Sequence, residues 1–247
     1  MRRGDKRVLS VSVALAVAAV AAVAFSLLVL DHRPRPSAAD SSSSLLVVTW
    51  GPSLCAVEPS NSGCRSGHVT QLGQTFVLHG LWPQPSTEQY CEVPKNVSDR
   101  KRAPVPLPDD LQARLHTMLS DAPLMTTHEW YAHGTCAGVT PPEYFSLATD
   151  LAGEVFRVLN PVFAASSGDQ LSARAVRQRF DTEFGGGAGT RVALSCKKAR
   201  GADVAYEVKL SLPAVTDLRD GAGALPLGKA ILRGPTIGAG CPQARVP

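Results

Sequence analysis

The nine residues from His128 to Cys136 contain two imidazoles, a carboxylate and a thiol. A third imidazole, His79, begins the run His-Gly-Leu-Trp-Pro about fifty residues earlier. Imidazole gives and takes protons near neutral pH, and a neighbouring carboxylate raises its pKa and can balance a positive charge. Three imidazoles and one carboxylate in two short segments therefore indicate acid–base catalysis, and we expect the two segments to meet in one active site.

The spacing within the second segment argues against a zinc protease. That class uses His-Glu-x-x-His, with two histidines four residues apart on one helical face. Here His128 and His133 are five residues apart, about 140° around a helix, whereas Glu129 shares a face with His133. The chain has no Cys-x-x-Cys pair for a structural zinc site, so we expect neither a metal nor a cofactor. The plainer alternative is that Glu129 caps its helix and one histidine is a core residue.

Two short elements must carry these side chains. Thr126, three residues before the carboxylate, fits a capping box, and Gly134 fits the residue just past a helix end. These signals predict a helix from about 127 to 133. The run 74–79 predicts a strand that delivers His79 at its end.

The remaining helices and strands lack a regular βαβ rhythm, which predicts the α+β class. Apolar runs and alternation predict three further strands, at 45–50, 191–197 and 204–212. Apolar stripes and capping signals predict three further helices, at 109–120, 141–160 and 171–180. The segment 84–108, rich in proline and charge, is expected to be a surface loop.

The first 39 residues are typical of an export signal, with a basic start, an apolar run over 8–30 and Ser-Ala-Ala at 37–39. The apolar run is also long enough to span a bilayer, so a retained anchor with its basic end inside competes with cleavage after residue 39. We expect the protein to be secreted, or anchored to the outer face of the membrane by residues 8–30. Residues 40–44 are expected to be a flexible spacer, and 45–247 the folded domain.

Charge and cysteine content narrow the class further. The first 39 residues hold six Lys/Arg and two Asp, so the net +4 of the chain leaves 19 basic and 19 acidic residues for the rest. Without a global basic field, a nucleic acid must be bound locally in a groove. The six cysteines all lie in the exported part and predict disulfides, although their spacing leaves fifteen pairings open.

The runs starting at His79 and His128 resemble the two active-site segments of the ribonuclease T2 family. The chain resembles a secreted, bacterial-type member of this family. Residues 45–50 resemble its first core strand, and the resemblance extends roughly from residue 45 to 241. It implies one domain with a mostly antiparallel central sheet flanked by helices. It also implies three disulfides, Cys55–Cys64, Cys91–Cys136 and Cys196–Cys241, the second of which would tie the two segments together.

The resemblance implies an endoribonuclease that cleaves single-stranded RNA without a metal. The ribose 2′-hydroxyl attacks its own phosphorus, the 5′-oxygen leaves, and a 2′,3′-cyclic phosphate forms. By position, His133 is the base, His79 the acid and His128 a phosphate contact, and the first two roles could be exchanged. Glu129 would support the charged imidazole and the pentacoordinate state. We expect a monomer with no stable protein partner, touching a membrane only through its N-terminal segment.

Base binding and one departure from the family complete the expected site. Trp82 and Tyr90 are candidates to stack on bases, although core packing is the plainer reading of each. Gln84 is a candidate base contact where some relatives have Asp. Ala132 stands where the family often has Lys, so another cation, from 100–102 or Arg65, would have to replace it. The rival functions are a non-catalytic module that binds RNA or a protein, and a metal-dependent hydrolase.

Overall fold

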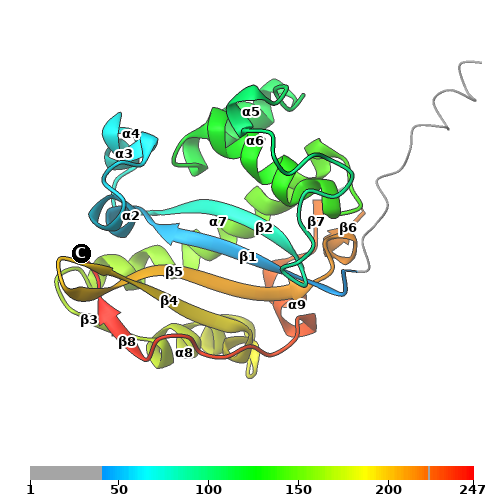
Figure 1. The fold of residues 1–247 in the computed structure, drawn as a ribbon. Coiled ribbons are helices and arrows are strands. Elements are labelled where there is room, and N and C mark those ends of the chain that lie inside the picture. Colours follow the sequence, from blue (N-terminus) through cyan, green and yellow to red (C-terminus); the bar gives the residue numbers. More distant parts are fainter. Residues whose placement is uncertain (1–40, 222) are drawn as a thin grey trace, which may run out of the picture. The chain divides into compact units, whose positions relative to one another are not determined.

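The computed structural model describes residues 41–221 and 223–247 (Figure 1). The expected export signal or anchor, residues 1–39, lies outside these described residues. Within them, no helix is both long enough and apolar enough to cross a membrane. The part that carries the two chemical segments can therefore be described by itself.

A six-stranded sheet lies at the centre of the described part (Figure 1). Its strand order is β2-β1-β5-β8-β3, and β4 pairs with β5 beside this path. Neighbouring strands are antiparallel except β5 and β8, which pair in parallel at one position. The expected α+β class with a mostly antiparallel sheet is confirmed. The strands are β1 (Ser43–Trp50), β2 (Phe76–Gln84), β3 (Gln170–Ser172), β4 (Val192–Ala199), β5 (Ala202–Pro213) and β8 (Gln243–Arg245).

Helices of very different lengths surround this sheet. The longest, α7 (Pro141–Ala165), starts at a capping box. In it the Thr140 side chain accepts the Glu143 backbone N–H, and the Glu143 side chain accepts the Thr140 backbone N–H. A small hairpin, β6 (Arg219–Asp220) and β7 (Gly223–Ala224), stands apart from the main sheet. The other helices are α2 (Gly51–Val57), α3 (Ser62–Arg65), α4 (His68–Leu72), α5 (Asp109–Met118), α6 (Ala122–Ala132), α8 (Ala173–Phe184) and α9 (Leu227–Arg233), with single 3₁₀ turns η1 (Asp99–Lys101), η2 (Gly134–Cys136), η3 (Ala188–Arg191) and η4 (Val215–Leu218).

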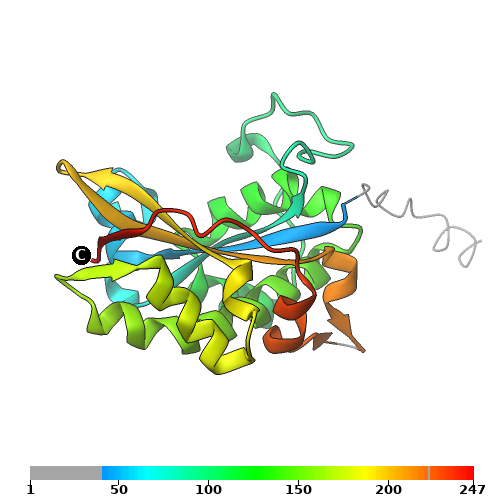
Figure 2. The same ribbon diagram turned by 90° about the horizontal axis from the view of Figure 1, so that it is seen from below.

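Alternation along β1 gives the sheet two different faces. Leu46, Val48 and Trp50 enter the main core, where α7 and α8 cover the sheet (Figure 2). The other face packs against α2 and α4 through a much smaller cluster that includes Val77 and Tyr206. This second face is therefore only partly covered, which leaves room for a site on it.

Several element boundaries differ from the sequence-based expectation, three of them away from the two chemical segments for a clear physical reason. β1 begins at Ser43, and the fully buried Ser44 donates its hydroxyl to the Pro213 carbonyl at 2.7 Å, so these residues are strand rather than spacer. α7 continues past Pro161 because Phe163, with no exposed surface, packs on Trp50 with ring centroids 5.3 Å apart. α8 begins at Ala173 rather than 171, because residues 170–172 form β3 against β8.

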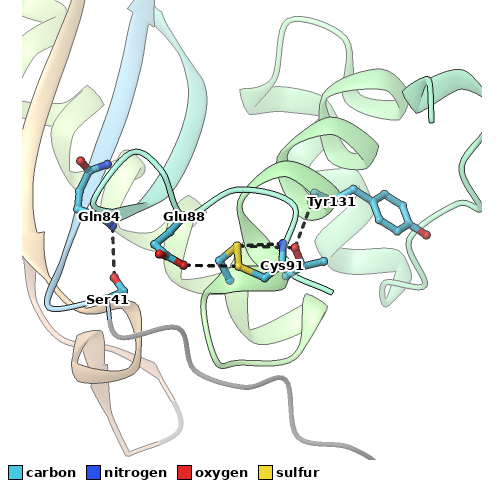
Figure 3. The surroundings of a disulfide bond; sticks show 7 residues. Ser41, Gln84, Glu88, Cys91 and Tyr131 are labelled. Carbon is cyan, nitrogen blue, oxygen red and sulfur yellow. Dashed lines mark hydrogen bonds between the residues drawn. A yellow bond between two sulfur atoms is a disulfide. The ribbon is translucent and has the colours of Figure 1, made fainter. Parts of the chain in front are cut away.

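Three disulfides join the described residues in the expected pairs: Cys55–Cys64, Cys91–Cys136 and Cys196–Cys241. The second connects the loop that follows β2 to η2, immediately after α6 (Figure 3). The Cys91 N–H donates to the Cys136 sulfur at 3.2 Å, which ties the loop backbone to the same point. The two chemical segments are thus covalently held near each other.

Candidate active site

His79 sits within β2, three residues after Phe76, and not at the end of the strand as expected. Val47 of β1 pairs with Gly80 and Val48 pairs with Leu78, so His79 is the extra residue of a β-bulge. Bulges re-aim side chains next to active sites without ending the strand. The strand continues to Gln84 and brings Trp82 beside His79, with ring centroids 5.0 Å apart.

The helix that carries the second segment, α6, starts at Ala122, five residues earlier than predicted. The Asp121 carboxylate accepts the Leu124 N–H at 3.2 Å and caps the helix, so Thr126 is not its cap. The end agrees with the prediction: α6 stops at Ala132 and Gly134 opens η2. A side chain at Gly134 would overlap the Trp130 ring, which explains the glycine.

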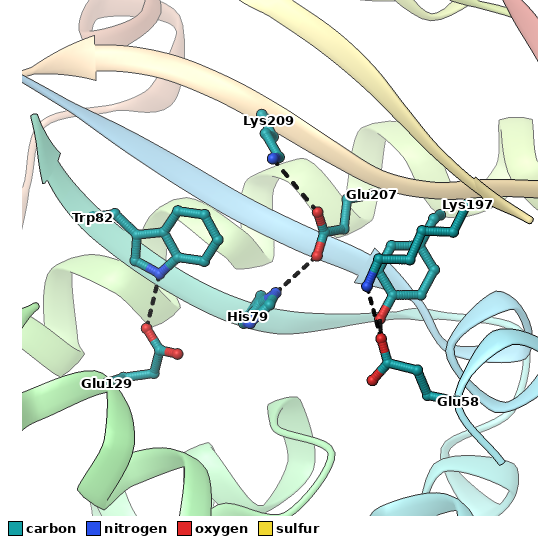
Figure 4. Close-up of polar contacts among 8 residues, drawn as sticks. Glu58, His79, Trp82, Glu129, Lys197, Glu207 and Lys209 are labelled. Atoms are coloured by element: carbon teal, nitrogen blue, oxygen red, sulfur yellow. Dashed lines mark hydrogen bonds and ion pairs between the residues drawn. The ribbon is translucent and has the colours of Figure 1, made fainter. Parts of the chain in front are cut away.

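The two segments meet through Trp82. Its indole N–H donates to Glu129 Oε2 at 3.0 Å (Figure 4). Its ring stacks on that of His133, with centroids 5.2 Å apart. The ring of His128 lies 6.1 Å from that of His133. Gly80 packs so closely on this contact that a Cβ there would overlap the Glu129 carboxylate. The expected convergence of the two segments is therefore observed in the structure.

The three histidines differ in what their Nδ1 atoms contact. His79 Nδ1 lies 2.9 Å from Glu207 Oε1, and the side chain keeps a third of its surface exposed. His128 Nδ1 lies 2.9 Å from Asp99 Oδ2. His133 is buried, and its Nδ1 has no hydrogen-bond partner among the described residues. Two rings are thus oriented by carboxylates with Nε2 left for other partners, and the third is not.

These surroundings give two of the rings opposite proton affinities. Burial alone would lower the pKa of His79, but the hydrogen bond to Glu207 and the charges of Glu129 and Glu207 outweigh it, so the pKa is raised. Burial, reinforced by the charges of His128 and His79, lowers the pKa of His133 to about 3. Burial raises the pKa of Glu129, against the influence of His79 and His128. The site can therefore hold a proton on His79 while His133 stays neutral.

Three charged residues at the site were not predicted. Glu207 and Lys209 project from β5, and Lys209 Nζ lies 3.7 Å from Glu207 Oε2 and 5.8 Å from the Trp82 ring centroid (Figure 4). Asp99 belongs to η1 in the loop expected to be a surface connection. A carboxylate inside an apolar strand was the signal that could have revealed Glu207. Nothing in the charged run around Asp99 distinguishes it from a solvated residue.

Arg102, one of the cations expected to replace the family lysine, is engaged with other partners. Ala132 is buried, and its carbonyl accepts the Tyr90 N–H at 2.9 Å. The Arg102 guanidinium lies over the Tyr90 and Tyr131 rings, 5.3 and 4.7 Å from their centroids, and donates to the Pro94 carbonyl. Arg102 thus holds the loop in place, and Arg65 lies in α3, next to the Cys55–Cys64 disulfide.

The expected base-binding residues do not gather equally around the histidines. Trp82 does, by its contacts with His79 and His133. The Tyr90 backbone abuts the end of α6, with its ring against Arg102. The Gln84 amide donates to the carbonyls of Trp82 and Pro83, and its backbone N–H binds the Ser41 hydroxyl (Figure 3). Their roles toward RNA bases remain predictions.

One group of side chains has the composition of a metal site. His128, Glu129 and His133 each offer a donor atom, and these atoms lie within 4.8 Å of one another. Three protein ligands of this kind also occur in catalytic zinc centres. Since Nδ1 of His128 is taken by Asp99, that residue would have to bind through Nε2. A chelator therefore belongs in any functional test of this site.

Curated relatives point to one activity. "Ribonuclease MC" from Momordica charantia is 29% identical over 175 residues, which cover 66% of this chain and 84% of the relative. A ribonuclease from Aeromonas hydrophila is 33% identical over 106 residues, covering 43% of this chain and 42% of the relative. The shared activity agrees with the function expected from the two chemical segments.

Solved structures and a family model agree with these relatives. A mutant of RNase MC1 in complex with 5′-UMP matches with a TM-score of 0.54 and 24% identity, covering 75% of this chain and 92% of that chain. RNase NT in complex with 5′-AMP matches with a TM-score of 0.56 and 19% identity, covering 76% and 96%. These two establish the fold. The model of the Ribonuclease T2 family matches residues 42–220, most of the chain. The chain therefore belongs to the ribonuclease T2 family, and it is a ribonuclease.

Proposed function

We propose that this ribonuclease cleaves single-stranded RNA internally by transphosphorylation, leaving 2′,3′-cyclic phosphate ends. The reaction needs a base for the 2′-hydroxyl, an acid for the leaving 5′-oxygen and positive or hydrogen-bonding groups at the phosphoryl oxygens. The observation that carries the proposal is the meeting of His79, His133 and Glu129 around Trp82, with the two imidazoles in contact with its ring. The pKa of His133 is lowered to about 3, whereas that of His79 is raised.

His133 is the base in this mechanism. With a pKa of about 3 its ring is neutral at neutral pH and ready to accept the proton of the 2′-hydroxyl. His79 is the acid, because its raised pKa favours the protonated ring that the leaving oxygen needs. The difference supports this assignment over the exchanged one, in which the ring with the lower pKa would have to donate the proton.

His128 and Glu129 act on the phosphate. Asp99 holds Nδ1 of His128, which leaves Nε2 to donate a hydrogen bond to a phosphoryl oxygen. Glu129 Oε2 is held by the Trp82 indole, while Oε1 is buried without a partner among the described residues. A buried acceptor of this kind is costly unless a ligand satisfies it. During the reaction, a protonated group of the substrate or an imidazole that has gained a proton can donate the missing hydrogen bond to Glu129 Oε1.

Substrate and location follow from the same features. The solved relatives in complex with 5′-UMP and 5′-AMP support a nucleotide site on this fold. Trp82, half-buried and already in the site, is the residue that we propose to stack on a base. The three disulfides are typical of an oxidising compartment, so we propose that the enzyme works outside the cytoplasm as a monomer, secreted or attached by its N-terminal segment.

A digest with product analysis tests the proposal. The purified protein is incubated with single-stranded RNA in EDTA, and the fragment ends are identified. Fragments with 2′,3′-cyclic phosphate ends are expected, because no step uses a metal. A strand with 2′-deoxyribose throughout should stay intact, and its cleavage would contradict the mechanism. Loss of RNA cleavage in EDTA would instead favour a metal held by His128, Glu129 and His133. Intact RNA in every condition would favour a non-catalytic binding module.

A further inference from the structure

Glu207 is an unusual residue for its position. It lies in the middle of β5, paired with Thr49 of β1 on one side and Ser195 of β4 on the other, and only 6% of its surface is exposed. Burying a carboxylate inside a sheet is costly unless another group compensates its charge. Its shortest contact is with His79, at 2.9 Å, followed by Lys209 at 3.7 Å. β5 thus contains a carboxylate whose burial costs free energy, and the main partner of this carboxylate is His79 of the candidate active site.

The backbone of both strands is adjusted to allow this contact. β2 and β5 both pair with β1 and are not neighbours, so their axes are about 10 Å apart. In β2 the extra residue of the bulge is His79 itself. In β5, Ser195 pairs with Glu207 and Cys196 with Ala205, so Tyr206 is the extra residue beside Glu207. Two bulges thus flank one contact that reaches across β1 (Figure 4).

We propose that Glu207 is a positioning residue for His79, and this inference rests on the proposed role of His79 as the acid. By accepting a hydrogen bond from Nδ1–H, the carboxylate fixes the ring orientation and tautomer, so that the transferable proton sits on Nε2. When that proton passes to the leaving 5′-oxygen, the neutral ring keeps its Nδ1 proton, and the next Nε2 proton comes from water.

Several other charges face His79, and Glu207 differs from them by direct contact. Glu129 from α6 also favours the protonated ring, whereas Lys197 from β4 opposes it. Lys197 is held by Glu58, which lies just after α2. Lys209 offsets part of the Glu207 charge, and the neutral His133 ring lies across Trp82. Of these groups, Glu207 is the one with a recorded hydrogen bond to the ring.

The test uses Glu207→Gln, which keeps the size of the side chain and removes its charge. On a ribodinucleotide at neutral pH, kcat/KM is expected to fall roughly 10- to 100-fold, the range known for loss of a carboxylate that orients a metal-bound histidine. The alkaline limb of the pH profile should move to lower pH. A nucleoside 3′-(4-nitrophenyl phosphate) has a leaving group that needs no proton, so the variant should cleave it almost normally. An equal loss on both substrates, or an unmoved alkaline limb, would overturn the inference.

Glu58→Gln is the matched control. It makes the same substitution on the same side of the sheet, in a carboxylate bound to Lys197 and Tyr206 rather than to a histidine. Glu58 and its partner Lys197 act on His79 through their charges rather than through a hydrogen bond, so the alkaline limb should move less than in Glu207→Gln. Circular dichroism and thermal unfolding check that both variants fold. If Glu207→Gln does not fold, ¹⁵N NMR of the unaltered protein decides, since a neutral His79 ring protonated on Nε2 instead of Nδ1 contradicts the inference.

NMR also separates this inference from the proposed function. The titration of His79 in the unaltered protein and in Glu207→Gln can be followed without any substrate, and the variant should titrate at lower pH. Identical titrations would refute the coupling even if RNA is cleaved. If the unaltered protein leaves RNA intact while the titrations differ, the proposed function fails and the Glu207–His79 pairing stands.

Discussion

The site has a sheet half and a helix half that reach catalytic competence by different routes. In the sheet half, His79 is oriented by Glu207, 128 residues further along the chain, across an intervening strand. In the helix half, Glu129 and His133 come from one local run, and His133 lacks an Nδ1 partner among the described residues. The sheet half favours a charged imidazole and the helix half a neutral one. Identical side chains thus acquire opposite proton affinities, from a buried carboxylate in one case and from burial and neighbouring imidazole charges in the other.

Removing one histidine from each half gives the largest expected effect. His79→Ala and His133→Ala should each lower kcat/KM on a ribodinucleotide by about 10²- to 10⁴-fold, the usual contribution of a general acid or base. On the 4-nitrophenyl ester, however, only His133→Ala should remain strongly impaired, because attack still needs a base. His68→Ala, in an exposed histidine outside the site, is the control. If both variants lose equal activity on the ester, the two halves do not divide the roles as proposed.

A smaller effect is expected where the halves touch. Gly80→Ala places a methyl group on the Glu129 carboxylate and close to the Trp82 indole, so the two segments must separate. Overpacking of this kind typically costs about 1–3 kcal/mol of unfolding free energy. We expect a lower melting temperature and a loss of kcat/KM on both substrates. Gly153→Ala, at a helical glycine with free space around it, should leave kcat/KM unchanged and keep or slightly raise the melting temperature, because alanine favours a helix more than glycine does. Equal melting temperatures of the two variants would mean that the contact tolerates separation.

Asp99 offers a direct comparison with Glu207. It orients His128 as Glu207 orients His79, but its side chain is 23% exposed and lies on a loop, whereas that of Glu207 is 8% exposed on a central strand. Water can replace a lost partner more easily at the loop. Asp99→Asn should therefore reduce kcat/KM by about tenfold, at the lower end of the range for such residues. A loss larger than that of Glu207→Gln would reverse our ranking of the two halves.

The smallest expected effect is the change of kcat/KM with pH between pH 4 and 6. His133, with a pKa of about 3, loses its function as base only when pH falls toward that value. His79, with a pKa raised above the ordinary 6.5, loses its function as acid only when pH rises past its own higher value. Between these limits both groups are in the required form, and kcat/KM on a ribodinucleotide should vary by less than about twofold. A steep rise in kcat/KM between pH 5 and 7 would show that His133 is an ordinary imidazole.

The helix half could be predicted from the sequence more fully than the sheet half. Glu129 and His133 are close in the chain, so helical spacing alone places them together. The predicted end of α6, just before Gly134, was also correct. Its predicted start was wrong because Asp121, and not Thr126, caps the helix. The contact of Glu207 with His79 could not be predicted from the neighbours of Glu207 in the sequence. The register of β5 against β1 and the bulge at Tyr206 decide where this side chain points.

The fold shows the same limit. Strands and helices with strong apolar patterns were predicted with errors at their ends, and a mostly antiparallel sheet was expected from the family resemblance. The bulge at His79 leaves no mark on the apolar pattern, because a bulge changes pairing rather than composition. That is why the predicted strand stopped at His79, although β2 runs on to Gln84. Long-range pairing is the part of the site that local patterns do not contain.

The Cys91–Cys136 bond makes the joining of the two chemical segments depend on the redox conditions around the protein. It closes a loop with a sequence separation of 45 residues, and in the chain-entropy view such a link restrains the unfolded state by ~4 kcal/mol. In a reducing compartment such as the cytosol the thiols stay reduced and this restraint is missing. We expect the newly made chain to be a poor nuclease until oxidation completes it, and activity followed during titration with dithiothreitol measures that difference. Oxidation of the thiols would then act as the last step of folding, and activity would report the redox state of the compartment that holds the protein.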